Sequence, residues 1–162
     1  MKSFLFFISL FVFSVNLNIN VVRNDYKAAA ASKTKANLFN DYLKGVSKKD
    51  DKRLVAYKGA AITLIAKHKK GIIKKTLTFK EGIEWIEFAI KKEPLNIEIR
   101  FVRLSIQQNS PKLLGYNKNI KGDKNFILKN FKAIKSNKLK KYLRSYIIDS
   151  NKFTQKEKSI ID

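Results

Sequence analysis

Apolar residues recur at helical spacing through the middle of the chain, on both sides of a proline. From Phe79 to Gln108 they fall three and four residues apart around Pro94, as on one face of an α-helix. This predicts two helices joined by a tight turn, on which the rest of the chain packs. Both helices carry a second apolar face, so each needs more than one neighbour. The positions are Phe79, Ile83, Ile86 and Ile90 with Trp85, Phe88 and Ala89, then Ile97, Phe101 and Leu104 with Ile99, Val102 and Ile106.

Capping signals indicate where these two helices begin and end. Thr78 and Glu81 fit the S/T-x-x-E capping box, which predicts that the first helix starts there. Pro94 ends that helix, because proline lacks an N–H and restricts the residue before it. Asn96 suits the N-cap of the second helix, since its side chain can accept hydrogen bonds from the first turn.

The other segments also have helical periodicity, and none shows sustained alternation of apolar and polar residues. The sequence therefore predicts an all-α fold of antiparallel helical hairpins with about seven or eight helices. The small residues Gly59, Ala60 and Ala61 would let another helix come close. We expect a short helix after Asn24, one capped by Ser32, one over 54–68, a basic loop over 67–75, a short helix from Pro111 to Gly115, one over 120–134, one capped by Asn137, and a last one opened by a Thr154–Glu157 capping box.

The N-terminus has the pattern of an export signal. Lys2 precedes an apolar run of 12 residues from Phe4 to Val15, which is short for a membrane span and suits a signal peptide. We predict a signal peptide over 1–20, cut between Asn16 and Val21, and one domain over 21–162. The alternative is an uncleaved N-terminal anchor. Either predicts an exported bacterial protein, periplasmic or extracellular, and the lack of Cys favours the periplasm.

Composition narrows the chemistry. The chain has 162 residues, 44% of them hydrophobic, with no Cys and a single His, His68. Thiol chemistry is excluded, and a zinc site or a His-activated nucleophile lacks its usual residues. We therefore predict no metal, no cofactor and no enzymatic activity. A carboxylate-dependent hydrolase using Glu81, Glu84 or Glu87 is the less favoured exception.

The charge is strongly positive. Lys and Arg number 35 against 13 Asp and Glu, a formal net charge of +22, and only 5 of the basic residues are Arg. Salt-sensitive adhesion to polyanions is expected at this charge. Specific nucleic-acid binding is not, because Arg is scarce and the aromatic residues of the Lys-rich C-terminal segment fall on apolar stripes. An AT-rich genome also yields Lys-rich chains, so the charge alone indicates no selected function.

The run Gly82, Ile86, Ala89 and Pro94 resembles the second helix of a tetratricopeptide repeat (TPR) and the turn after it. The likeness covers about 30 residues. The repeat would place Leu-Gly twelve residues before Gly82, where this chain has Lys69 and Lys70. The resemblance implies a degenerate TPR-like array over 21–162. The whole chain also resembles a group of small exported bacterial helical proteins, a likeness that implies no activity.

Two arginines on the second central helix are the candidate binding residues. Arg100 and Arg103 lie on a helix that the pattern predicts to be mostly buried. In one interpretation they are structural and pair with a carboxylate such as Asp123 or Glu87. In the other they line a groove for an anionic or peptide ligand, because guanidinium groups bind carboxylates through two bonds. The candidate groove residues are Arg100, Arg103, Gln107, Tyr116, Asn117 and Asn119.

Two functions remain after these exclusions. The first is a non-enzymatic helical-repeat module that binds a protein or peptide in a groove, with modest dependence on salt. The second is a cationic protein that adheres to anionic envelope components, namely lipid, polysaccharide or nucleic acid, and that releases them as salt rises. Contact with the membrane itself would follow if the N-terminal segment stays uncleaved.

Overall fold

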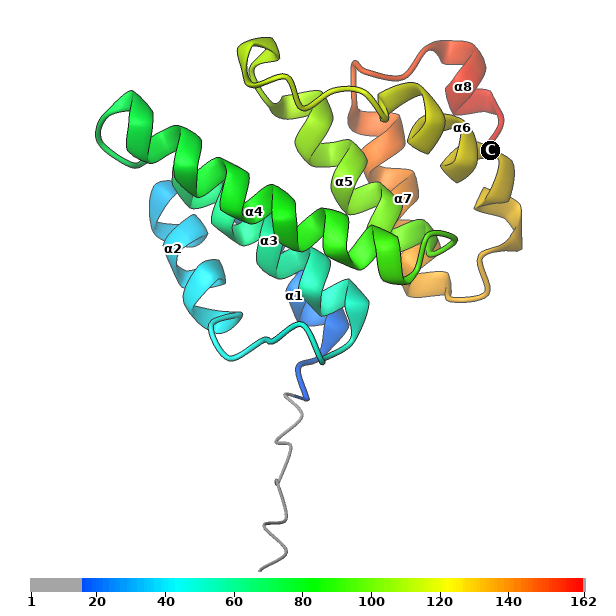
Figure 1. The fold of residues 1–162 in the computed structure, drawn as a ribbon. Coiled ribbons are helices and arrows are strands. Elements are labelled where there is room, and N and C mark those ends of the chain that lie inside the picture. The colour runs from blue at the N-terminus through cyan, green and yellow to red at the C-terminus, as the bar shows by residue number, and fades with distance from the viewer. Residues whose placement is uncertain (1–15, 162) are drawn as a thin grey trace, which may run out of the picture.

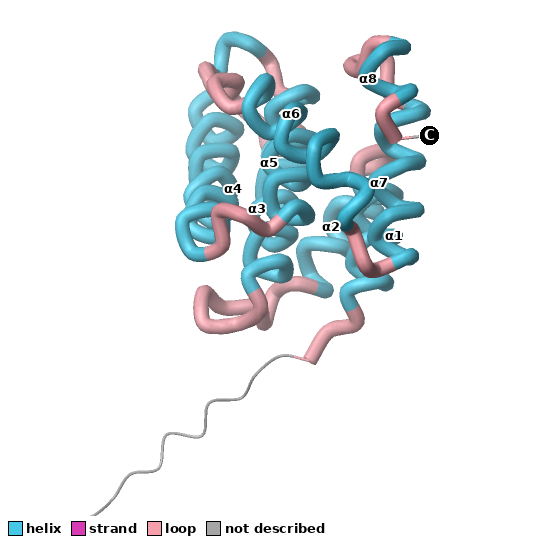
Figure 2. Tube along the Cα trace, turned by 90° about the vertical axis from the view of Figure 1, so that its right-hand side faces the viewer, coloured by secondary structure: helices cyan, strands magenta, loops and turns pink. Residues whose placement is uncertain are grey.

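The protein is described here by a computed structural model covering residues 16–161. This part of the chain contains eight α-helices, two short 3₁₀ helices and no strand (Figures 1 and 2), which confirms the all-α prediction. The predicted signal peptide lies mostly outside the described residues. The elements are α1 (Ile19–Ala29), α2 (Lys33–Tyr42), α3 (Lys52–Ala66), α4 (Ile72–Lys92), α5 (Ile97–Asn109), η1 (Lys112–Leu114), α6 (Ile120–Asn130), η2 (Phe131–Ala133), α7 (Asn137–Asp149) and α8 (Gln155–Ser159).

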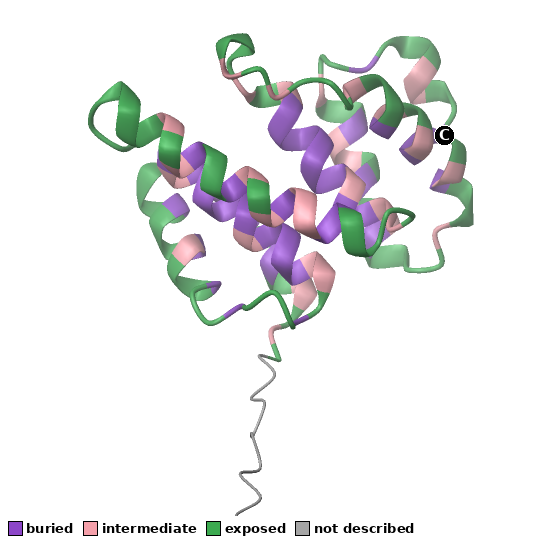
Figure 3. Ribbon diagram, in the orientation of Figure 1, coloured by how far each residue is buried: buried purple, intermediate pink, exposed green. Residues whose placement is uncertain are grey.

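Helix α5 is the centre of the fold. Every residue from Phe101 to Gln107 is buried, and Figure 3 shows this helix as a continuous buried stretch. It packs on α3, α4 and α6, while Phe101 meets the edges of Tyr142 and Tyr146 on α7 at ring-centroid distances of 5.4 and 4.9 Å. The prediction that the second central helix needs several neighbours is confirmed.

Helices α3 and α4 form an antiparallel hairpin whose backbones nearly touch. A Cβ placed on Gly59 would lie 2.5 Å from the carbonyl oxygen of Gly82, and one on Gly82 would lie 2.6 Å from that of Gly59. Gly59, Ala60 and Ala61 are all buried, so the predicted close approach is confirmed.

The second apolar face of α4 is covered differently from the first. Phe79, Ile86 and Ala89 are buried, but Trp85 and Phe88 are only partly so. The amine of Lys48 lies 5.5 Å from the Trp85 ring centroid and 5.2 Å from that of Phe88. A lysine on the connector before α3 therefore covers this face through cation–π contacts.

Several helix boundaries differ from the predictions. Helix α4 begins at Ile72 after Gly71, whose φ is +80°, so the Thr78–Glu81 capping box is wrong because both residues lie inside the helix. Nothing between Gly71 and Thr78 interrupts a helix, and the basic segment simply continues it. Helix α1 is capped by Asn18 and not Asn24, because Val22 and Arg23 are buried and extend the helix towards the N-terminus.

Other caps match the sequence. The Ser32 side chain accepts a bond from Lys35, and Asn96 accepts bonds from Glu98 and Ile99. The Thr154–Glu157 capping box is present in both directions. Helix α7 is capped by Ser136, one residue before the predicted Asn137.

Candidate functional site

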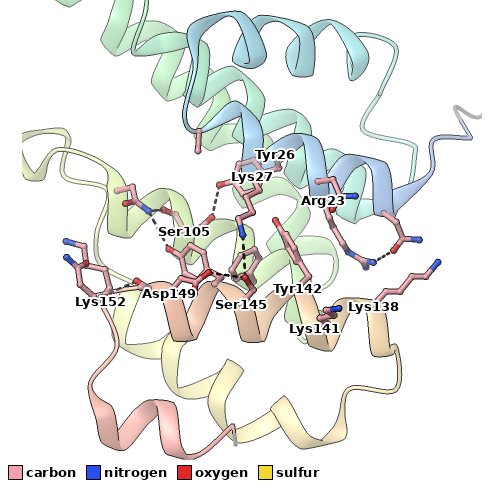
Figure 4. A pocket seen from close by; sticks show the side chains of 18 residues that line it. Arg23, Tyr26, Lys27, Ser105, Lys138, Lys141, Tyr142, Ser145, Asp149 and Lys152 are labelled. Carbon is pink, nitrogen blue, oxygen red and sulfur yellow. Dashed lines mark hydrogen bonds between the residues drawn. The ribbon is translucent and has the colours of Figure 1, made fainter.

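A cleft of about 930 Å³ lies between α1 and α7, with Phe101, Ser105 and Asn109 of α5 also in its lining (Figure 4). We call it the α1–α7 cleft. Its two walls are more than 100 residues apart in the chain, and α5 holds them in place because both helices pack on it. The lining residues are Asn20, Arg23, Asn24, Tyr26, Lys27, Ala30, Phe101, Ser105, Asn109, Lys138, Lys141, Tyr142, Ser145, Tyr146, Asp149, Ser150, Asn151 and Lys152.

The floor of the cleft is aromatic. Tyr142 and Tyr146 are four residues apart on α7, so they lie on one face of the helix, and both meet Phe101 edge-on. Tyr26 contributes from α1, and its ring also contacts Phe39 and Tyr57 behind the cleft. Large rings fixed by such contacts form a rigid apolar surface.

The hydroxyls of the tyrosine rings form hydrogen bonds with neighbouring hydroxyl and amide side chains. The hydroxyls of Tyr26 and Ser105 are 2.7 Å apart and bonded. The Tyr146 hydroxyl donates to Oε1 of Gln108 at 2.9 Å and accepts from Asn109 at 3.4 Å. These bonds hold the rings in one orientation and leave hydrogen-bonding groups beside an apolar floor.

The rim of the cleft is cationic. The described lining residues include four lysines, Lys27, Lys138, Lys141 and Lys152, and a single carboxylate, Asp149. The Lys27 amine donates to Ser145 at 3.4 Å, and the Ser145 hydroxyl donates to Asp149 at 3.1 Å. The lysine excess makes the cleft attractive to negative charge.

A buried ion pair closes one end of the cleft. Arg23 donates from Nε and Nη2 to the two carboxylate oxygens of Glu98, at 2.8 and 2.6 Å. The Tyr57 hydroxyl donates to the same carboxylate at 3.0 Å, and Asn20 accepts from Nη1 of Arg23. Burial lowers the pKa of Arg23, but its bonds to Glu98 outweigh this and the pKa is raised. The bonds of Arg23 and Tyr57 to Glu98 thus link α1, α3 and α5.

Burial raises the pKa of five tyrosines, three of which line the cleft. The pKa of Tyr146 rises to about 12 through burial, against which its bond with Asn109 acts weakly. Burial is also the first cause of the upward pKa shift of the other four. The five are Tyr26, Tyr57, Tyr116, Tyr142 and Tyr146.

The protein is therefore expected to lose stability in alkali above pH ~10. Phenols in the unfolded chain ionise near pH ~10, whereas in the folded protein they stay neutral to higher pH, so ionisation favours the unfolded state as pH rises through this window. Tyr146 alone would contribute on the order of 2 kcal/mol by pH ~12. Phenolate absorbance at 295 nm should rise together with the loss of helical circular dichroism. Full ionisation near pH ~10 with the helices intact would contradict the burial.

The predicted groove residues lie on another face, formed by α4, α5 and α6. Arg103 is 6% exposed and donates from Nε and Nη2 to Asp123 at 2.7 and 2.9 Å, and from Nη1 to Glu87 at 3.0 Å. Arg100 also bonds Asp123, at 3.0 Å, and its Nε donates to the Pro94 carbonyl. Arg100 and Arg103 therefore pair with Asp123 and Glu87, as expected if their role is structural.

Of the other four candidate residues, only Tyr116 is bonded to the group formed by Arg100, Arg103, Asp123 and Glu87. Tyr116 donates to the second oxygen of Glu87 at 2.6 Å, which links it to Arg103. Gln107 donates to Asn119 at 3.3 Å, while its own Oε1 is buried and unbonded. Asn117 is exposed. None of the six candidates lines the α1–α7 cleft.

Little in the sequence indicates the cleft. The apolar stripe of α7 predicts that Tyr142 and Tyr146 belong to the core. They do pack on Phe101, yet the same rings also line the cleft. Arg23 carried a usable signal, since it is one of only five arginines in the chain. The lysines of the rim carried none, because lysines occur everywhere in this chain.

Groups suited to metal binding are not assembled in residues 16–161. No three His, Cys, Asp or Glu side chains gather there as a metal site would require. His68 lies exposed in the turn after α3, because that helix ends at Ala66. Glu81 and Glu84 are exposed on α4. Nor does any helix of this part have the length and apolarity needed to cross a membrane.

In comparisons with protein-family models, with curated proteins and with solved structures, nothing matches this chain.

Proposed function

We propose that the protein is a non-enzymatic binding module that holds an acidic segment of another protein or peptide in the α1–α7 cleft. The observation that carries this proposal is the combination of an aromatic floor with a rim of four lysines. The floor suits apolar side chains, the hydroxyls and amides suit a peptide backbone, and the lysines suit carboxylates. The proposed ligand therefore binds in this cleft, and not at the face of Arg100 and Arg103 that the sequence suggested.

The geometry favours a peptide over a compact metabolite. A volume of about 930 Å³ is near the upper end of the range for small-molecule sites, roughly 300–1,000 Å³. The cleft runs between two helices, which is a common way to hold an extended or helical segment. Its cations stand at the rim, where they steer and orient a ligand.

Reversing the charge of two rim lysines is expected to weaken peptide binding strongly. We take as probe a fluorescein-labelled peptide in which phenylalanine and glutamate alternate, and as reference its glutamine counterpart. Lys138→Glu with Lys141→Glu should weaken binding of the glutamate peptide at least about tenfold, because two attractive charges become repulsive. Fluorescence anisotropy at about 0.15 M salt, with circular dichroism to verify folding, measures this.

The control pair is Lys129→Glu with Lys132→Glu, which makes the same charge change at exposed positions outside the cleft. It should leave binding within about twofold. Residual binding at about 0.5 M salt, where the Debye length is only a few Å, would reflect the aromatic floor. Equal weakening by both pairs, or equal affinity for the glutamine peptide, would contradict the cleft.

A second candidate is adhesion to anionic envelope components, and one observation favours it. Glu98 and Asp123 are buried, and Glu87 and Asp51 pair with arginines. The outer surface is consequently even more dominated by lysine than the composition suggests. Such adhesion would depend on the number of lysines and not on their position, and it would collapse as salt rises. The rim pair and the control pair described above separate it from cleft binding.

The position of α1 bears on the proposed export signal. Asn18 caps α1, and Leu17 and Ile19 pack against the core. Cleavage at or before the bond between Asn16 and Leu17 would keep this packing, whereas a cut at Val21 would remove the cap. We propose the earlier cut, and the mass of the exported protein would locate it.

The α3–α4 hairpin supports a TPR-like array with longer helices than the repeat has. Gly82 packs on Gly59 of the preceding helix, and not on a residue at positions 69 and 70, where the repeat would place Leu-Gly. Helices α3 and α4 hold 15 and 21 residues, which together exceed the roughly 34 residues of a whole tetratricopeptide repeat.

A further inference from the structure

The turn between α3 and α4 and the first turns of α4 project from the molecule and expose large apolar side chains. We call residues 67–80 the hairpin tip. Ile72, Ile73 and Leu77 are 69%, 72% and 62% exposed, and Figure 3 shows the tip as almost wholly exposed. Single exposed apolar residues are ordinary, but three within two turns of one helix form a patch that marks an interaction site.

The side chains of Ile73 and Leu77 point away from the body of the protein, while Ile72 is exposed at the start of the helix. Ile73 and Gly82 are separated by about two and a half helical turns, so they lie on opposite sides of α4. Gly82 is the residue pressed against α3. Leu77 follows Ile73 by about one turn and shares its side. The outer side of α4 is thus apolar at its start, where a helix on the surface is normally polar.

Lysines surround this apolar patch, and the tip itself contains no carboxylate. Between positions 67 and 80 the chain contains no Asp or Glu. All the lysines of the tip are exposed. They are Lys67, Lys69, Lys70, Lys74, Lys75 and Lys80.

We propose that the hairpin tip docks on the surface of an anionic lipid bilayer, with Ile72, Ile73 and Leu77 in the headgroup layer and the lysines on lipid phosphates. Helices that lie in a membrane interface combine an apolar face with a polar side rich in lysine, and each lysine near an anionic bilayer adds to binding. The tip is convex and exposed, whereas a hot spot for a protein partner is usually a packed pocket. The inference does not depend on the α1–α7 cleft.

A single fluorescent label can read this contact directly. The chain has no Cys, so Leu77→Cys in the full chain accepts one environment-sensitive nitrobenzoxadiazole group at the tip. On phosphatidylcholine vesicles containing phosphatidylglycerol, the emission should shift to the blue and brighten several-fold. The control is Leu113→Cys in η1, which is 91% exposed and should stay in water. Residues 1–15 are present in both samples, so any contribution from them is common to both.

Vesicle binding should depend on the lysines of the tip, and not on the total number of lysines in the chain. Lys67→Gln, Lys70→Gln and Lys74→Gln together should raise the lipid concentration for half the Leu77→Cys response about tenfold or more. Lys121→Gln, Lys129→Gln and Lys132→Gln, which are exposed elsewhere, should change it little. Four results would overturn the proposal: no shift at position 77, an equal shift at 113, an equal response on pure phosphatidylcholine, or a response only to a protein partner.

Discussion

Replacing Arg103 with alanine is expected to lower the free energy of unfolding by about 3–5 kcal/mol, because it breaks a buried ion pair and leaves the other member without its partner. Arg103 is 6% exposed, and Asp123 is fully buried. Asp123 would lose two of its three arginine bonds, keeping only the one from Arg100. Urea unfolding followed by circular dichroism measures the change.

The matched control is Arg53→Ala. Arg53 also pairs with a carboxylate, Asp51, but both side chains are more than a third exposed. Surface pairs contribute about 0–1 kcal/mol, so the control should be nearly neutral. If Arg103→Ala also cost under about 1 kcal/mol, the structural interpretation of this pair would fail. Arg100 and Arg103 would then become candidate ligand contacts again.

The buried carboxylates explain how so basic a chain can fold compactly. Glu98 joins α5 to Arg23 on α1 and Tyr57 on α3, while Asp123 joins α6 to two arginines on α5. Few carboxylates are available, and these two lie where they join several helices at once. The arginines in these pairs suit that role, since guanidinium forms two parallel bonds to a carboxylate and is less strongly hydrated than an ammonium group.

Local pattern was enough to predict the fold class and several of the helix ends. Helical spacing, Pro94 and the caps at Ser32, Asn96 and Thr154 are properties of short segments, and they do not depend on the rest of the chain. The errors arose where tertiary contacts decide. Helix α1 starts early because Val22 packs inside, and the Thr78–Glu81 motif was outweighed by a helix already begun at Ile72.

The candidate site could not be predicted because it is assembled from distant segments. Lys27 and Ser145 are bonded across 118 positions, and Arg23 and Glu98 across 75. No periodicity or motif within a single helix contains such a pairing. The sequence does single out Arg100 and Arg103, because arginine is unusual on a helix that is otherwise apolar. The reason for their presence there is the ion pair with buried Asp123, and not a ligand.

Replacing Gly59 with alanine is expected to cost about 3 kcal/mol or more, at the upper end of the range for overpacking. Its new methyl group would lie 2.5 Å from the Gly82 carbonyl oxygen and 2.9 Å from the Ile86 amide nitrogen. Both are backbone atoms, so no side chain can rotate away, and α3 and α4 would have to separate. Separation would open gaps around buried residues that both helices share. Thermal and urea unfolding measure the effect.

The matched control is Gly122→Ala in α6, where an added methyl group meets nothing within 4 Å. There alanine should stabilise the protein by about 0.5–1 kcal/mol, because glycine is the poorer helix former. The two substitutions are chemically identical and should have opposite signs. Gly82→Ala should resemble Gly59→Ala, since its methyl group would lie 2.6 Å from the Gly59 carbonyl oxygen. Tolerance of alanine at both Gly59 and Gly82 would mean that α3 and α4 are farther apart than described, and the TPR-like packing proposed for this hairpin would lose its basis.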